Sequence, residues 1–257
     1  MPTLIHYHIF KNGGSSIDRL LAESFGPGWR VFEGLHAEDA VDADRLRAFL
    51  ASEPSVRAVS SHLARPPLPR QDCFPIVLLR HPIDRARSIY EHLRRDPSQQ
   101  DHAAAQSSFA DFVTWALDTP GAGVVIRDYQ VIHLSDATFR QSDIQLATPT
   151  CDDLAQVQTI LSSWPAFGLV RQFAASCSLF QARYAPFFPE LRLSFVRENV
   201  SPNSLATEAD AIASARDELG PVLFGRLCEA NQLDLALYSF ASRLFCELCT
   251  ANDPKCV

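Results

Sequence analysis

An apolar segment near the start of the chain runs directly into a glycine-containing loop and then into a helical pattern. Thr3 to Phe10 is apolar and partly β-branched, which is typical of a buried strand. Apolar residues at helical spacing then extend from Ser16 to Phe25. The loop between them consists of Lys11, Asn12, Gly13, Gly14, Ser15 and Ser16. Because glycines allow close backbone approach and the free N–H groups of a first helical turn attract negative charge, the loop is predicted to bind an anion.

Strands and helices alternate through the following part of the chain. Strands are predicted at Val56–Ser60 and Ile76–Leu79, and helices at Asp42–Ala51 and from Pro82 to about Arg95. This alternation predicts an α/β fold with a P-loop-like core, in which helices flank a central, largely parallel sheet. We expect one domain that spans 1–257. Its other predicted elements are a helix at Phe109–Leu117, a strand at Phe167–Val170, a helix at Phe173–Ala182, a strand at Arg192–Arg197 and two C-terminal helices.

Composition narrows the class of protein. Of the 257 residues, 47% are hydrophobic and 21% are charged, which is typical of an ordinary globular chain. A net charge of −7 argues against nucleic acid as a partner, because phosphate backbones are bound by positive fields. The first residues lack the pattern of a signal peptide, and no apolar run is long enough to span a bilayer. We therefore expect a cytoplasmic protein without a transmembrane segment.

Neither the cysteines nor a histidine pair gives a clear metal pattern. The seven cysteines are an odd number scattered over the chain, which favours reduced thiols. Cys246 and Cys249 form a lone C-x-x-C without the further ligands of a zinc site, so we interpret them as packing on a helix face. His6 and His8 share one face of the first strand and could ligate a metal, but buried strand histidines are more common. We expect no metal.

The order of residues in the first loop separates it from the usual nucleoside-triphosphate loop. That loop reads G-x-x-x-x-G-K-[ST], whereas Lys11 comes before the glycines here. A magnesium-binding acid is also expected at the end of a neighbouring strand in that class, yet Arg80 stands there. These differences favour a shorter, metal-free anion site. The alternative is a simple turn from strand to helix, with Lys11 as a solvated cation.

A second candidate anion site lies at the next junction of strand and helix. Arg80 ends the predicted strand, and Ser88 lies two turns into the following helix, so both side chains could reach one ligand. An arginine fork with a hydroxyl is a suitable clamp for a monophosphate. Arg85 and Arg87 are interpreted as ordinary helix-face charges.

The two motifs resemble those of sulfotransferases that use 3′-phosphoadenosine 5′-phosphosulfate. Residues 9–16 are similar to the family's 5′-phosphosulfate loop and residues 79–90 to its 3′-phosphate motif, in the same order. The chain looks most like the branch that contains the uronyl 2-O-sulfotransferases and related carbohydrate sulfotransferases. It departs from the family at Phe10, where proline is usual, at Asn12, where threonine is usual, and at Arg171, where an acid is common. Weaker similarity covers residues 167–170, 198–201 and 231–245.

The resemblance implies a cofactor and a role for each matched residue. The cofactor is 3′-phosphoadenosine 5′-phosphosulfate, and the product is adenosine 3′,5′-bisphosphate, with no metal. Lys11 and residues 12–16 hold the phosphosulfate, and Lys11 also stabilises charge on the departing phosphate. Arg80 and Ser88 hold the 3′-phosphate, while Arg197 and Ser201 close over the nucleotide.

Transfer to a hydroxyl needs a general base, and His62 is the predicted one. An alcohol is a weak nucleophile until its proton is removed, and histidine suits this role near neutral pH. His62 follows a predicted strand in a segment that resembles the catalytic histidine segment of the uronyl branch. An ordinary loop histidine is the alternative. His81 fits the N-cap of a helix better than a catalytic role.

The acceptor is predicted only as a class. The acidic net charge favours a neutral or weakly charged hydroxyl in a glycan, lipid or small molecule, and residues 96–165 are expected to form the insertion that selects it. Two alternatives remain open: a P-loop nucleotide kinase, and a non-catalytic nucleotide-binding protein of the same fold.

Overall fold

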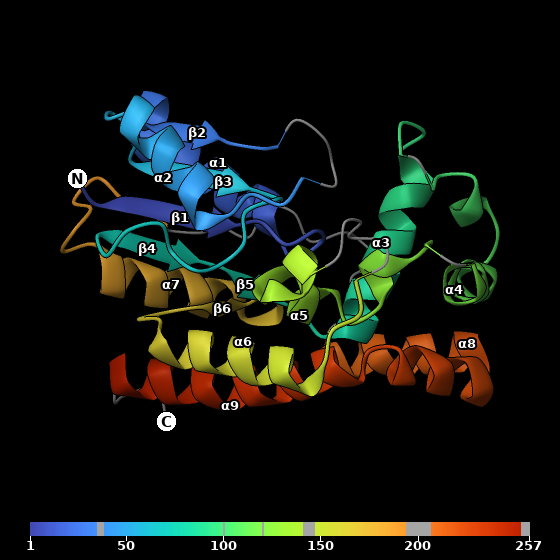
Figure 1. Cartoon of the computed structure of the whole chain (residues 1–257). Helices are drawn as coiled ribbons and strands as arrows, with labels where there is room; N and C mark the ends of the chain where they lie inside the picture. The colour runs from blue at the N-terminus through green and yellow to red at the C-terminus, as the bar shows by residue number, and fades with distance from the viewer. Residues whose placement is uncertain (35–38, 100, 120, 141–146, 194–206, 253–257) are drawn as a thin grey trace.

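The computed structural model describes residues 1–34, 39–99, 101–119, 121–140, 147–193 and 207–252. In Figure 1, α1 and α2 lie near β2 and β3, α7 lies beside β6, and α6 and α9 are packed beyond α7. The strands are β1 (Thr3–Tyr7), β2 (Trp29–Val31), β3 (Ala58–Ser61), β4 (Cys73–Ile76), β5 (Leu78–Leu79) and β6 (Gly168–Leu169). The helices are α1 (Gly14–Phe25), α2 (Ala43–Ser52), α3 (Pro82–Arg95), α4 (Phe109–Asp118), α5 (Tyr129–Leu134), α6 (Cys151–Ser163), α7 (Phe173–Tyr184), α8 (Glu208–Glu229) and α9 (Gln232–Asn252).

All described strand pairs are parallel. The main sheet has the order β2-β3-β1-β4, and β5 pairs with β6 in a second, two-stranded sheet. Every residue of β1 is buried, which explains its continuous apolar pattern. The prediction of an α/β fold with a central parallel sheet and flanking helices is therefore confirmed.

Two hydrophobic cores support this arrangement. The larger core lies around the main sheet, where α1 packs through the predicted face that carries Ile17, Leu20, Leu21 and Phe25. The smaller core joins α3 to α4 and α8 at one end of the sheet (Figure 1). Helix α8 bends at Gly220, where φ is 68° and Pro221 follows. The buried residues Ile83, Ala86, Ile89, Tyr90 and Leu93 of α3 all belong to this smaller core.

Most predicted elements are present, with three corrections. The first strand ends at Tyr7 rather than Phe10, because the backbone turns when the N–H of Ile9 bonds to the Tyr7 carbonyl. The predicted strand Ile76–Leu79 is divided, because the chain leaves β1 after Ile76 and pairs with β6 from Leu78. Residues 192–193 of the predicted strand Arg192–Arg197 are not in a strand, and the rest of it lies outside the described residues.

The middle of the chain is more ordered than its irregular pattern indicates. Besides α4, the segment 96–165 contains α5 and α6. A capping box at Thr150 and Asp153 begins α6 and was the overlooked sequence signal. Helix α5 is buried along its whole length, so it lacks the polar face by which a short helix is recognised. Among the described residues, no helix has the length and apolar character needed to cross a membrane.

Candidate anion-binding site

A cavity of about 380 Å³ opens where β1 ends and α1 begins. It brings together predicted residues from three parts of the chain: the first loop, the end of β3 and the junction before α3. These residues are Lys11, Gly13, Gly14, Ser15, Ser16, His62, Arg80 and Ser88. The lining also includes four residues that were not predicted to bind a ligand, namely His8, Phe10, His92 and Val170. No carboxylate belongs to the lining among the described residues.

The loop after β1 presents positive charge and a helix N-terminus to this cavity. Gly13, with φ of 74°, precedes α1 and supplies no side chain that could cap it. The first turn carries no acid, so its N–H groups and helix dipole favour an anion. Burial, and then the charge of Arg80, lower the pKa of Lys11. A bound anion would offset this repulsion between cations.

Lys11 holds a backbone conformation that L-residues disfavour. Its φ is 62°, in the left-handed region, which costs a residue with a Cβ roughly 1–2 kcal/mol. Lys11→Gly is therefore expected to be more stable to unfolding than Lys11→Ala by about 1 kcal/mol. Urea unfolding of the two variants measures the difference. Both variants lack the ammonium group, so both should lose affinity for the anion to the same extent. Equal free energies of unfolding would show that the backbone at Lys11 is not strained.

Asn12 is the loop residue whose side chain does not line the cavity. It is buried, and its Nδ2 donates to the carbonyl of Leu78 and to Oε1 of Gln130, at 2.8 Å each. Gln130 in turn accepts from the backbone N–H of Arg80 and donates to the Arg80 carbonyl. The side chain of Asn12 therefore ties the loop to β5 and α5, which leaves its backbone for any contact with a ligand.

Arg80 is held by a buried acid on the following helix. Its Nε donates to Asp84 at 2.8 Å, and another of its nitrogens donates to the carbonyl of Lys11. Arg171 also donates to Asp84, through two nitrogens. Burial alone would raise the pKa of Asp84, but the hydrogen bonds and charges of the two arginines lower it. Arg171, which stands where the resembled family often has an acid, therefore helps to keep Asp84 ionised and Arg80 in place.

His62 has the arrangement of an oriented base. Its Nδ1 lies 2.9 Å from Oε1 of Glu33, which also accepts the backbone N–H of His62. Burial would raise the pKa of Glu33, but these contacts with His62 lower it. A carboxylate beside Nδ1 favours the tautomer with hydrogen on that atom. Nε2 is then free to accept a proton.

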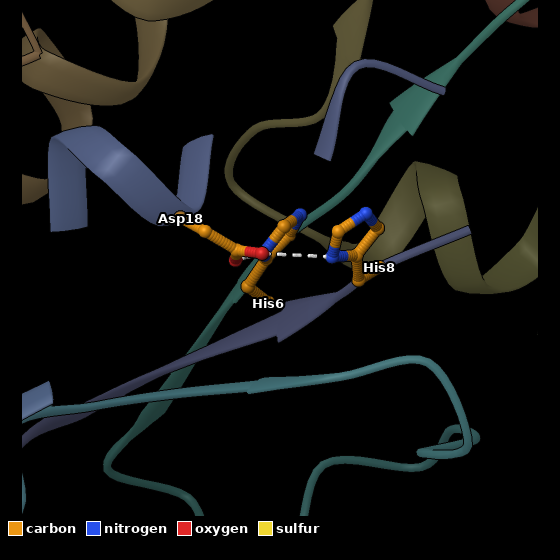
Figure 2. Close-up of side chains that lie close together, drawn as sticks. All are labelled: His6, His8 and Asp18. Carbon is orange, nitrogen blue, oxygen red and sulfur yellow. Dashed lines mark hydrogen bonds and ion pairs between the residues drawn. The ribbon is translucent and has the colours of Figure 1, made fainter. Parts of the chain in front are cut away.

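Two further histidines, His6 and His8, meet Asp18 (Figure 2). Nδ1 of His6 lies 2.8 Å from one oxygen of Asp18, and Nδ1 of His8 lies 2.9 Å from the other. The rings of His8 and His62 are stacked, with centroids 3.8 Å apart. These nitrogen–oxygen distances are those of hydrogen bonds and ion pairs, whereas two ligands of a tetrahedral zinc ion would be about 3.3 Å apart. The ligand atoms of His6, His8 and Asp18 all lie within 4.8 Å of one another, so the same group could also hold a metal ion.

Arg197 and Ser201 lie outside the described residues. Of the unpredicted lining residues, His8 had one sequence signal, because it lies in the predicted strand a few residues before the anion loop. His92 and Phe10, whose rings meet edge to face, had none, since their approach depends on how α3 packs.

Comparisons with known proteins do not assign a family. No protein-family model matches the chain. An uncharacterized protein from Archaeoglobus fulgidus is 25% identical over 252 residues, which cover 91% of this chain and 94% of that protein. The crystal structure of a sulfotransferase from Alicyclobacillus acidocaldarius is similar over 93% of this chain and 99% of that one, with 19% identity and a TM-score of 0.39. That likeness is too distant to assign a function.

Proposed function

We propose that this chain transfers a sulfuryl group from 3′-phosphoadenosine 5′-phosphosulfate to an acceptor hydroxyl. The observation that carries the proposal is the single cavity lined by the Lys11 loop, by Arg80 with Ser88, and by His62. The first two are anion-binding groups, and the third is a base. An enzyme that transfers a group to a hydroxyl from a nucleotide with two separate phosphate-like groups needs this combination.

The residues of the cavity divide the chemistry between them. When bound, the nucleotide supplies the sulfuryl group and the leaving phosphate. His62 accepts the acceptor's proton at Nε2 as the acceptor oxygen bonds to sulfur. Lys11 would stabilise the electron pair that stays on the leaving phosphate when the sulfuryl group passes to the acceptor oxygen. Arg80 and Ser88 hold the other phosphate, which fixes the nucleotide's orientation.

Calorimetric titration with adenosine 3′,5′-bisphosphate tests the nucleotide. Binding is expected without magnesium, and Arg80→Ala is expected to weaken it by about tenfold to a hundredfold, because charge-assisted hydrogen bonds are lost. Arg171 still pairs with Asp84 in that variant, so the fold should persist. Arg94→Ala removes an exposed charge from α3, the helix that follows Arg80, and is the matched control.

Two other functions are outcomes of the same titration. Binding of ATP with magnesium, and not of the bisphosphate, would indicate a nucleotide kinase, although the cavity lining offers no carboxylate for the metal among the described residues. Binding of the bisphosphate without transfer to any acceptor would indicate a non-catalytic nucleotide-binding protein. The acceptor, a hydroxyl in a glycan, lipid or small molecule, the uronyl branch and a cytoplasmic location stay predictions.

A further inference from the structure

The ring of His8 lies directly over the start of α1. A Cβ placed on Gly14 would come within 2.0 Å of Cδ2 and 2.2 Å of Nε2 of this ring. His8 is 6% exposed, so the ring has little room to turn away. Only glycine at position 14 leaves space for this contact. Nε2 of His8 is therefore fixed beside the helix N-terminus at which an anion is expected to bind.

The other side of the ring faces a carboxylate. Asp18 approaches Nδ1 of His8 at 2.9 Å, although the N–H makes no directed hydrogen bond within the described part of the chain. Burial would raise the pKa of Asp18, but its hydrogen bond with His6 and its contact with His8 hold that pKa far below its usual range. Burial lowers the pKa of His6 to about 4, so His6 is neutral. The half-buried negative charge of Asp18 thus faces His8 without a cationic His6 to balance it.

His8 lies between two places that carry or attract negative charge. Asp18 lies 2.9 Å from its Nδ1, and its Nε2 lies beside the helix N-terminus at which an anion is expected. The ring of His62 stacks on that of His8, with centroids 3.8 Å apart, and both residues line the same cavity. The predicted base and a contact to the anion are therefore neighbours in one cavity.

We propose that His8 contacts the transferred sulfuryl group through Nε2 and that Asp18 is its positioning residue. This inference rests on the proposed function. It assigns to His8 the recognition of the group by which the donor nucleotide differs from the product. His8 therefore determines how strongly the site prefers 3′-phosphoadenosine 5′-phosphosulfate to adenosine 3′,5′-bisphosphate.

The test compares the dissociation constants of the two nucleotides, measured by calorimetry at low temperature. His8→Phe retains a ring against Gly14 and His62 but has no Nε2. It is expected to weaken binding of the phosphosulfate by about tenfold or more while that of the bisphosphate changes by less than about twofold. Asp18→Asn should change the same ratio in the same direction, which a merely structural role would not do. His102→Asn, outside the cavity lining, is the matched control.

Each outcome decides a different question. If the unaltered protein binds neither nucleotide, the proposed function fails. If it binds both and His8→Phe changes the two affinities equally or not at all, the role of His8 fails while the proposed function stands. If His8→Phe does not fold, His8→Gln, which keeps a polar end, is measured in the same way. Stoichiometric metal in the purified protein, lost in His6→Ala, would assign the cluster to a metal site and overturn the inference.

Discussion

His62→Asn is expected to slow sulfuryl transfer by at least about a hundredfold, the usual contribution of a general base. The reason is geometric: Glu33 occupies Nδ1, so Nε2 is the nitrogen that faces a ligand in the cavity. The asparagine side chain can form a hydrogen bond but cannot act as a base near neutral pH. Affinity for adenosine 3′,5′-bisphosphate should stay within about twofold, because the base acts on the acceptor and not on the nucleotide.

The rate is measured as release of adenosine 3′,5′-bisphosphate from the phosphosulfate, with an acceptor selected from a panel of sugars, lipids and small alcohols. Glu33→Gln is the matched variant, since it preserves an oxygen acceptor beside Nδ1 and removes the charge. It should reduce the rate less than His62→Asn does. A His62→Asn enzyme with a near-normal rate would remove His62 from the role of base.

The sequence predicted the parts of this site that depend on local pattern. A buried strand, the glycines and the following helix mark the loop at Lys11 without knowledge of any distant contact. Arg80 and Ser88 are equally local, because a strand end and two turns of helix fix their spacing. These predictions placed both groups on one edge of the sheet, and the cavity contains them together.

The role of His8 depends on contacts that are not local. Its ring could face either side of the sheet edge, and the structure shows that Gly14 and His62 decide its position. Asn12 was predicted to bind the phosphosulfate, yet its side chain bonds to Gln130 from the poorly predicted middle segment. No periodicity in the sequence indicates such a contact, because a buried polar pair depends on the tertiary fold.

A pair of buried acids supports the same middle segment. The backbone N–H of Asp234 donates to Asp128 at 2.7 Å, and the Asp234 carboxylate accepts the backbone N–H groups of Gln130 and Val131. Burial, and then the charge of Asp234, raise the pKa of Asp128 to about 7. The same acids thus hold Gln130, which fixes Asn12 and Arg80 at the cavity.

As the pH rises from about 4 to about 8, the free energy of unfolding of Asp128→Asn is expected to increase by about 2–4 kcal/mol relative to that of the unaltered protein. In the unfolded chain an aspartate has a pKa of about 3.9, so between that pH and about 7 the folded protein holds a proton that the unfolded chain has lost. The stabilisation from Asp128 is therefore complete below about pH 4 and is lost as the pH rises through about 7. Asparagine keeps the carbonyl acceptor, tolerates the φ of 42°, and carries no charge.

Urea unfolding at these two pH values measures this difference, and unfolding of Asp153→Asn at about pH 2 and about pH 4 gives a contrast of opposite sign. Burial would raise the pKa of Asp153, but Arg140 and the backbone of Thr150 lower it to about 2. Its contribution is present above the unfolded pKa and is lost as the pH falls, so Asp153→Asn should lose stability relative to the unaltered protein as the pH rises through about 2 to 4. If Asp128→Asn instead followed Asp153→Asn, Asp128 would be ionised in the folded state, and the support beneath Gln130 would be an ordinary charged cap.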